Sequence, residues 1–178
     1  MDIYKHKFTS LQCEIFSLLC FRAGEKLNQL AIANLLKVSP TAVGKALPGL
    51  VKEQMVKLEK GNINFVQLNR DDRRVVMLKR VENLRFIYES GLPVFLEESF
   101  PGCAVVLFGS YSRGEDSVKS DIDIAVVGTK GRSVDLSGYE KKLGKTIRIN
   151  FYASFNDIHI DLKSSIVSGI TLAGVIRL

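Results

Sequence analysis

The feature that most constrains this chain is the segment from residue 104 to residue 127. An apolar run, Ala104-Val105-Val106-Leu107-Phe108, is followed by a glycine and a serine, and after a gap of ten residues by two aspartates one residue apart. β-Branched and aromatic residues in a short run that ends at glycine are typical of a buried strand. Asp121 to Val127 predicts a second strand, on which alternate side chains share a face. Asp121 and Asp123 are therefore expected side by side.

The chemistry of this segment points to phosphate and metal binding. A short helical turn is expected from Ser110 to Gly114, and the backbone N–H groups at such a helix start attract phosphate oxygens. Two carboxylates this close repel one another unless a cation lies between them. Mg²⁺ suits the pair, because it prefers one or two carboxylates together with waters and substrate phosphates. The segment therefore predicts a site for a triphosphate and its metal.

These residues resemble a known signature. Gly109-Ser110, the gap and Asp121-Ile122-Asp123-Ile124 are similar to the motif of the polymerase-beta-type nucleotidyltransferase superfamily, and Arg113-Gly114 resembles its small prokaryotic branch, the minimal nucleotidyltransferases. The resemblance implies a mixed sheet with flanking helices, and transfer of a nucleoside monophosphate with release of pyrophosphate. It also implies that Gly109 and Ser110 bind the β- and γ-phosphates, and that Asp121 and Asp123 are the catalytic metal ligands. Arg113 is a further candidate phosphate ligand through its planar guanidinium, or else a solvated residue near a helix end.

A third carboxylate on a later strand usually completes the site in this superfamily, where it holds the second metal ion. The strand expected over residues 146–152 places Ile147, Ile149 and Phe151 toward the core. Arg148, Asn150 and Tyr152 are then left to face Asp121 and Asp123, and none of them is a carboxylate. Arg148 is expected to repel a second metal ion and to pair with one of the two aspartates.

Three explanations of this departure stay open. In the first, the strand alignment is shifted and Asp135, Asp157 or Asp161 is the third carboxylate. In the second, one metal ion suffices and a partner protein supplies the remaining catalytic groups. In the third, the site binds nucleotide without turnover. Asp157 and Asp161 fit better in a helix over residues 157–168, with Asn156 or Asp157 as its cap. His159 has no second histidine or cysteine near it in sequence to form a metal site.

The first third of the chain predicts a different domain. Helical patterns cover residues 11–22, 27–36 and 41–51, with Ser39 as an N-cap and Pro40 in the first helical position. Alternating segments within residues 55–68 then predict a hairpin around a Gly61-Asn62 turn. Over roughly residues 8–70, three helices and a hairpin resemble the winged helix-turn-helix of prokaryotic transcription regulators.

Nucleic-acid contact is the expected role of this domain. Pro48 is expected to kink or end the third helix, which leaves residues 41–47 as the recognition element. Its outward positions include Thr41, Gly44 and Lys45, a set better suited to positioning on the phosphate backbone than to reading bases. Thr41 and Lys45 are the candidate nucleic-acid ligands.

Charge supports this division of roles. Residues 1–80 hold 14 Lys and Arg against 7 Asp and Glu, whereas residues 81–178 hold 11 against 12. Positive charge concentrated on a winged helix indicates a phosphate-backbone partner, and DNA is the expected one. The alternative is a winged helix that contacts only protein.

An ordered connector is expected between the domains. Apolar residues at helical spacing follow Asp71-Asp72 and predict a helix that is interrupted at Gly91, with a second short helix before residue 101. The chain is therefore expected to be an α+β protein: a winged helix-turn-helix at 1–70, a helical connector at 71–100 and a nucleotidyltransferase-like domain at 101–178.

Composition excludes several classes. In 178 residues no apolar stretch is long enough to span a membrane, and the polar amino terminus is unlike a signal peptide. The three cysteines, Cys13, Cys20 and Cys103, are unclustered, so neither disulfides nor structural zinc is expected. Unpaired cysteines are typical of cytoplasmic proteins, and a cytoplasmic location is therefore expected.

Two functions therefore remain open. The first is a Mg²⁺-dependent nucleotidyltransferase that uses a nucleoside triphosphate, with two metal ions if fully active or with one, and is guided by a DNA-binding winged helix. The second is a catalytically weak or inactive regulator that binds DNA and senses a nucleotide. A homodimer is compatible with either, and the acceptor cannot be read from the sequence.

Overall fold

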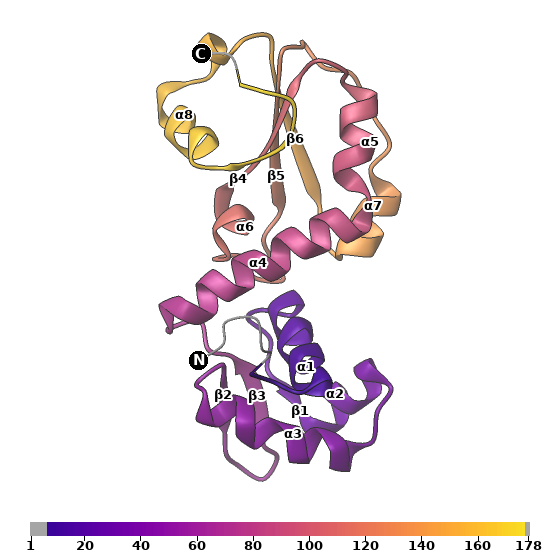
Figure 1. Cartoon of the computed structure of the whole chain (residues 1–178), viewed down its shortest axis with the longest axis vertical. Coiled ribbons are helices and arrows are strands. Elements are labelled where there is room, and N and C mark those ends of the chain that lie inside the picture. Colours follow the sequence, from indigo (N-terminus) through magenta and orange to yellow (C-terminus); the bar gives the residue numbers. More distant parts are fainter. Residues whose placement is uncertain (1–6, 177–178) are drawn as a thin grey trace. The chain divides into compact units, whose positions relative to one another are not determined.

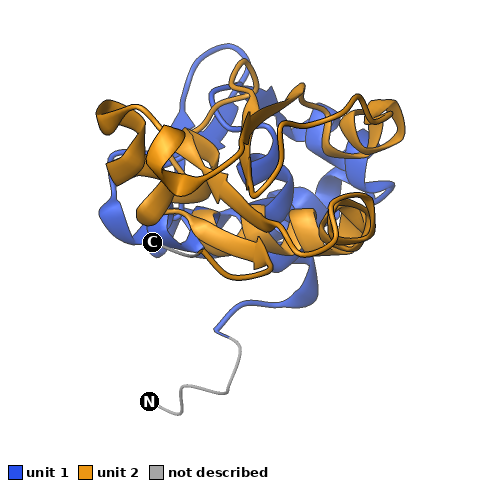
Figure 2. Cartoon of the chain, turned by 90° about the horizontal axis from the view of Figure 1, so that it is seen from above, with its two compact units in different colours: residues 1–79 blue, residues 80–178 orange. Residues whose placement is uncertain are grey.

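The structure is a computed structural model that describes residues 7–176, and the chain divides into two compact units, residues 1–79 and 80–178 (Figure 2). Helix α4 (Arg73–Ser90) contains the point of division. Asp72 begins this helix, because its Oδ1 accepts a hydrogen bond from the backbone N–H of Arg74 at 2.8 Å. The helices predicted within residues 71–100 are observed as α4 and α5 (Leu92–Ser99), and the two units meet within α4 without a separate connector.

The first unit is a winged helix (Figure 1). Its elements are α1 (Ser10–Phe21), β1 (Leu27–Asn28), α2 (Gln29–Leu36), α3 (Pro40–Lys52), β2 (Val56–Glu59) and β3 (Phe65–Leu68). The strands form an antiparallel sheet in the order β1-β3-β2. The sequence prediction of helices followed by a hairpin is confirmed for this part of the chain.

Side-chain caps explain why the helices begin where they do. The predicted cap of α3 is confirmed, since Ser39 Oγ accepts from the Ala42 N–H at 3.2 Å and Pro40 takes the first helical position. Asn28 caps α2 in the same way, through its Oδ1 and the Ala31 N–H at 2.8 Å. Each cap satisfies a donor that has no partner inside the helix.

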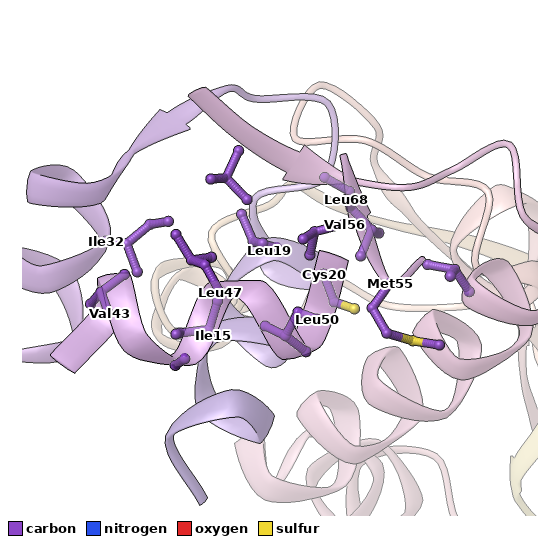
Figure 3. Close-up of a cluster of buried hydrophobic side chains, with 14 of the residues drawn as sticks. Ile15, Leu19, Cys20, Ile32, Val43, Leu47, Leu50, Met55, Val56 and Leu68 are labelled. Atoms are coloured by element: carbon purple, nitrogen blue, oxygen red, sulfur yellow. The ribbon is translucent and has the colours of Figure 1, made fainter. Parts of the chain in front are cut away.

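The interior of this unit is apolar (Figure 3). Its helices and its hairpin all contribute side chains that are at most 7% exposed: Ile15, Leu19, Cys20, Ile32, Val43, Leu47, Leu50, Met55, Val56 and Leu68. Burial of this apolar surface is what holds the short helices together, because helices of 8 to 13 residues are marginal alone.

Three details of the first unit differ from the sequence prediction. Helix α3 continues through Pro48 to Lys52, so its expected end at residue 47 is wrong; Pro48 lies on the exposed side, where its ring meets solvent and no core contact is lost. Leu27 and Asn28 form a strand paired with β3 before α2 begins. The hairpin pairs Glu59 with Phe65, so residues 60–64 connect the strands instead of a two-residue turn.

The second unit is built on a mixed sheet in the order β6-β5-β4-β7. Strand β5 (Ile122–Val127) pairs parallel with β6 (Ile147–Tyr152) and antiparallel with β4 (Ala104–Phe108), which also pairs antiparallel with β7 (Ile170–Ala173). The helices are α5, α6 (Gly109–Arg113), α7 (Ser137–Leu143) and α8 (Ile160–Val167), with a 3₁₀ turn at Phe155–Asp157. The mixed sheet with flanking helices confirms the predicted α+β class.

Strand β5 separates two apolar layers. Ile122, Ile124 and Val126 pack in one cluster with residues of α5 and α7, whereas Ala125 and Val127 pack in the other with Ile158 and with Ile166 of α8. Side chains alternate along a strand, so Asp123 belongs to the face that carries Ala125. The two layers bury β5 on both faces, except at Asp123 near its start, which is only half-buried.

Two details of the second unit correct the sequence prediction. Helix α8 begins at Ile160 and not at residue 157, because Ser154 and Asp157 cap the separate 3₁₀ turn that precedes it and His159 is the N-cap of α8. The sequence also predicts a last strand over residues 170–178, but β7 ends at Ala173, and residues 177–178 of the predicted strand lie outside the described residues.

None of the helices within residues 7–176 combines the length and the apolar content needed to cross a bilayer. The three cysteines carry free thiols.

Candidate functional site

The site is organised by the contact between Gly109 and Asp123. Phe108 at the end of β4 pairs with Asp123 of β5, which places the following Gly109 against the carboxylate. A methyl group added to Gly109 would lie 2.6 Å from Oδ2 of Asp123, and the backbone there has φ +77°. Both the space and the backbone conformation therefore require glycine. The predicted phosphate-binding turn and the predicted metal ligand meet at this point.

Helix α6 is a short turn with a left-handed glycine on each side. Gly109 opens it and Gly114, at φ +76°, closes it. Ser112 Oγ donates to the Gly109 carbonyl at 2.9 Å, which ties the end of the turn to its start. The first N–H groups of a helix have no acceptor within that helix. The backbone at Gly109 and Ser110 is therefore held in a fixed shape next to Asp123.

Asp121 directly precedes β5 and its charge acts on Asp123 of that strand, and Arg148 contacts this pair from β6. Arg148 pairs with Asp123 across the parallel strands β5 and β6. Its Nη2 is 2.8 Å from Oδ2 of Asp121. The expectation that Arg148 would bind one of the two aspartates is confirmed, and Asp121 is the one.

The charges of Asp121 and Arg148 act on the carboxylate of Asp123. Burial raises the pKa of Asp123, the negative charge of Asp121 raises it further, and Arg148 acts in the opposite direction. The carboxylates thus repel each other in the absence of a cation. Two adjacent carboxylates beside a phosphate-binding turn fit one Mg²⁺, whose hard oxygen preference they satisfy.

The three alternative third carboxylates are engaged elsewhere. Asp135 Oδ1 accepts from the Ser137 N–H at 3.0 Å, and Asp157 Oδ2 accepts from the Ser154 N–H at 2.9 Å. Asp161 lies 3.2 Å from Nδ1 of His159 and is highly exposed. Across residues 7–176, no three His, Cys, Asp or Glu side chains gather to hold a metal ion. A second acidic metal centre is therefore not built into the described residues.

Arg113 lies at the end of α6 and contacts another side chain. Its Nε donates to Oε2 of Glu115 at 2.7 Å, and both side chains are about half exposed. Its role as a phosphate ligand stays a prediction, since it would have to exchange this exposed ion pair for a phosphate. Such exposed pairs contribute only about 0–1 kcal/mol.

A buried polar network behind the site was not anticipated from the sequence. Lys145 Nζ lies 3.3 Å from Oδ2 of Asp116, and these side chains are 5% and 1% exposed. Asn83 of α4 donates through Nδ2 to Asp116 Oδ1 at 2.6 Å and to the Tyr111 carbonyl at 2.8 Å. Lys145 also donates to the carbonyl oxygens of Ser117 and Ser120. The network therefore holds α6 and the loop that leads to Asp121.

Tyr111 completes the network from α6. The Lys145 Nζ lies 5.8 Å from the centre of its ring, and burial together with the charge of Asp116 raises the pKa of its hydroxyl well above the ordinary range. The tyrosine is therefore neutral and serves packing. One signal in the sequence could have indicated the network: Asn83 and Ser90 share the helix face of Ile87, where apolar residues are expected.

The predicted nucleic-acid ligands belong to the first unit and are separate from this site. Thr41 and Lys45 are exposed on α3, one turn apart. Gly44 lies close to Gln29 of α2, since an added methyl group would approach its Nε2 to 2.9 Å. Helices α2 and α3 therefore pack closely while Thr41 and Lys45 stay accessible.

Residues 92–171 match the family model described as "Nucleotidyltransferase domain". The match includes Gly109, Ser110, Asp121 and Asp123, so this part of the chain is similar to that family. No curated protein matches the sequence.

Among solved structures, similarity is found to ZitR and to AdcR. A mutant of ZitR from Lactococcus lactis is 24% identical with a TM-score of 0.41, and the match covers 56% of this chain and 65% of that chain. The adhesin competence repressor AdcR from Streptococcus pyogenes is 22% identical with a TM-score of 0.40, over 53% of this chain and 69% of that chain. The chain thus spans slightly less than two thirds of the ZitR structure. The resemblance is too low to indicate a function.

Proposed function

We propose that the nucleotidyltransferase domain moves a nucleoside monophosphate from a nucleoside triphosphate to an acceptor, with Mg²⁺ held by Asp121 and Asp123. In this reaction an acceptor oxygen forms a bond to the α-phosphorus while the bond from that phosphorus to the bridging oxygen breaks. Pyrophosphate leaves with the electron pair, and the acceptor's proton passes to water. Bound Mg²⁺ supplies the positive charge that the phosphate oxygens need.

The observation that carries this proposal is the contact between Gly109 and Asp123. A backbone whose N–H groups can donate to phosphate oxygens lies against a carboxylate that can bind a metal. A methyl carbon added at Gly109 would lie 2.6 Å from Oδ2 of Asp123, so the two groups are close together. Only a ligand that carries both phosphate and metal uses these two groups together. A triphosphate with its Mg²⁺ is such a ligand.

The chain's own residues have three roles in this proposal. Gly109 and Ser110 bind and orient the β- and γ-phosphates, and Asp121 with Asp123 fixes the metal ion. The buried network of Asn83, Asp116 and Lys145 holds the loop between these two groups. Positioning of this kind supplies most of the catalysis in phosphoryl transfer.

The test is transfer of label from each of four α-labelled nucleoside triphosphates in the presence of Mg²⁺. Labelled protein, nucleic acid or small molecules are sought together with released pyrophosphate. Gly109→Ala is expected to abolish nucleotide binding, because its methyl group would meet the Asp123 carboxylate. Gly138→Ala is the matched control, since a methyl group there meets nothing within 4 Å.

A second function is favoured by one observation, the ion pair between Arg148 and Asp121. An arginine where a third carboxylate is expected fits a domain that binds a nucleotide without turning it over. Such a chain would be a regulator that senses a nucleotide. Metal-dependent nucleotide binding with persistent failure to label any acceptor would select this function over the first.

We propose DNA as the partner of the winged helix, through Thr41 and Lys45. Residues 1–80 contain 14 basic and 7 acidic residues, and this positive charge supports the assignment. A cytoplasmic location fits the free thiols. Homodimer formation stays a prediction, to be checked by light scattering.

A further inference from the structure

Arg148 occupies a special place in the site. Because β5 and β6 pair in parallel with Asp123 opposite Arg148, both side chains leave the sheet on the same face. The guanidinium reaches past Asp123 to Asp121, where its Nη2 lies 2.8 Å from Oδ2. The Arg148 side chain is 68% exposed, whereas that of Asp121 is 29% exposed. A positive charge thus lies at the outer side of the carboxylate pair.

The surroundings offer nothing that would attract a second metal ion there. Asp135, Asp157 and Asp161 are used in local contacts, each within two or three residues in sequence. Within residues 7–176 no group of three His, Cys, Asp or Glu side chains is placed to bind a metal. A second Mg²⁺ would therefore have to bind beside the Arg148 guanidinium, with no added carboxylate to offset the repulsion.

The charges of the site fit one metal ion. Two carboxylates and one guanidinium carry a net charge of −1, and one Mg²⁺ changes this to +1, which attracts a triphosphate anion. A guanidinium also carries five N–H donors in a planar fork, so an ion pair to Asp121 through Nη2 is compatible with donation to a phosphate oxygen.

We infer that Arg148 takes the place of the second metal ion, so that the site binds one Mg²⁺ with its triphosphate and Arg148 supplies the remaining positive charge. The inference rests on the proposed function, because it concerns the nucleotide site described there. Arg148 thereby positions Asp121 and contacts the phosphate that is transferred.

Metal stoichiometry tests this inference without relying on activity. The full chain is mixed with a triphosphate analogue that has a non-cleavable α,β bridge, and Mn²⁺ is titrated while bound ions are counted by electron paramagnetic resonance. One Mn²⁺ per chain is expected for the unmodified protein. Arg148→Asp replaces the guanidinium by the missing carboxylate and is expected to bind two.

Three further variants make the result specific. Arg132→Asp makes the same substitution at an exposed arginine whose guanidinium contacts the Ser99 carbonyl, and is expected to keep one Mn²⁺. Arg148→Lys retains the charge and is expected to keep one ion as well. Arg148→Gln removes the charge without adding a ligand, and is expected to tighten Mn²⁺ at the single site about tenfold.

The outcomes separate this inference from the proposed function. Two Mn²⁺ in the unmodified protein, or one in a folded Arg148→Asp variant, would overturn the role of Arg148 while leaving a metal–nucleotide site intact. If Arg148→Asp does not fold, an unchanged Mn²⁺ affinity in Arg148→Gln overturns it equally. Absence of any Mn²⁺-dependent nucleotide binding would overturn the proposed function and the inference with it.

Discussion

The two compact units differ most in what they bury. The winged helix has an apolar interior drawn from its helices and hairpin. Among the described residues, four of the five buried polar side chains lie in the second unit, and the fifth, Lys79, is the last residue of the first unit; the four are Asn83, Ser90, Ser112 and Asp116. Burying polar groups costs stability unless each is hydrogen-bonded, so they are retained where they hold a site in place. The second unit accordingly carries a positioned site, whereas the first is a scaffold that presents a surface.

The largest effect that this comparison predicts is on nucleotide binding. Asp121→Asn together with Asp123→Asn removes both charges that hold the metal, and Mg²⁺-dependent affinity for a triphosphate should fall at least ~100-fold. Isothermal titration measures it. The control, Asp135→Asn with Asp161→Asn, makes the same change at two exposed aspartates and should leave the affinity unchanged. Equal affinity in the two double variants would mean that the site lies elsewhere.

The next effect is on stability. Lys145→Met removes a cation from the buried Asp116 carboxylate, and loss of one partner of a buried pair costs about 3–5 kcal/mol. Urea unfolding followed by circular dichroism measures the free energy of unfolding. The control is Lys119→Met, which changes an exposed lysine in the loop that carries Asp116 and should cost less than about 0.5 kcal/mol. A small loss at Lys145 would mean that the network does not hold the second unit.

The same contrast explains what the sequence could predict. The strands on either side of Gly109 and the pairing of Arg148 with an aspartate follow from local periodicity and charge, and the structure confirms them. The cap at Ser39 was equally local. These features depend on residues close in sequence or on one strand, where simple periodicity is informative.

The features that were missed depend on distant residues. Asn83 and Asp116 are 33 positions apart, and Lys145 lies on a third segment, so no local pattern joins them. Pro48 was expected to end α3, yet core contacts of Leu47 and Leu50 on either side hold the helix together. Tertiary packing overrides a local preference of about 3 kcal/mol in such cases.

A smaller effect is expected on the surface of the first unit. Lys45→Ala removes one exposed positive charge from α3, so DNA affinity should fall a few-fold and the slope of log affinity against log salt should decrease by about 0.9. Fluorescence anisotropy at several salt concentrations measures both. Lys57→Ala is the control, because Lys57 lies on strand β2 of the hairpin and its charge is paired with Asp71. A salt slope that is the same in all three proteins would indicate a partner other than nucleic acid.

The smallest effect concerns Asp123, whose ionised carboxylate lowers the free energy of unfolding. Burial and Asp121 raise the pKa of Asp123, so the folded protein holds this proton more tightly than the unfolded chain does. The stabilising contribution is therefore complete below the unfolded pKa of about 3.9 and is lost as the pH rises through the folded pKa. Asp123→Asn avoids this loss and should increase the free energy of unfolding at pH 7 in the absence of metal, by less than about 1 kcal/mol because the site is partly open to solvent.

The dependence of this gain on pH decides whether its cause is electrostatic. The difference between Asp123→Asn and the unmodified protein should grow between pH 4 and pH 7, as the unmodified carboxylate ionises beside Asp121. Differential scanning fluorimetry follows it, with Asp161→Asn as the control, whose carboxylate is exposed beside His159. A variant less stable than the unmodified protein at pH 7 would contradict the repulsion. If Asp123→Asn gains stability and loses nucleotide binding, Asp123 serves ligand binding at the expense of stability.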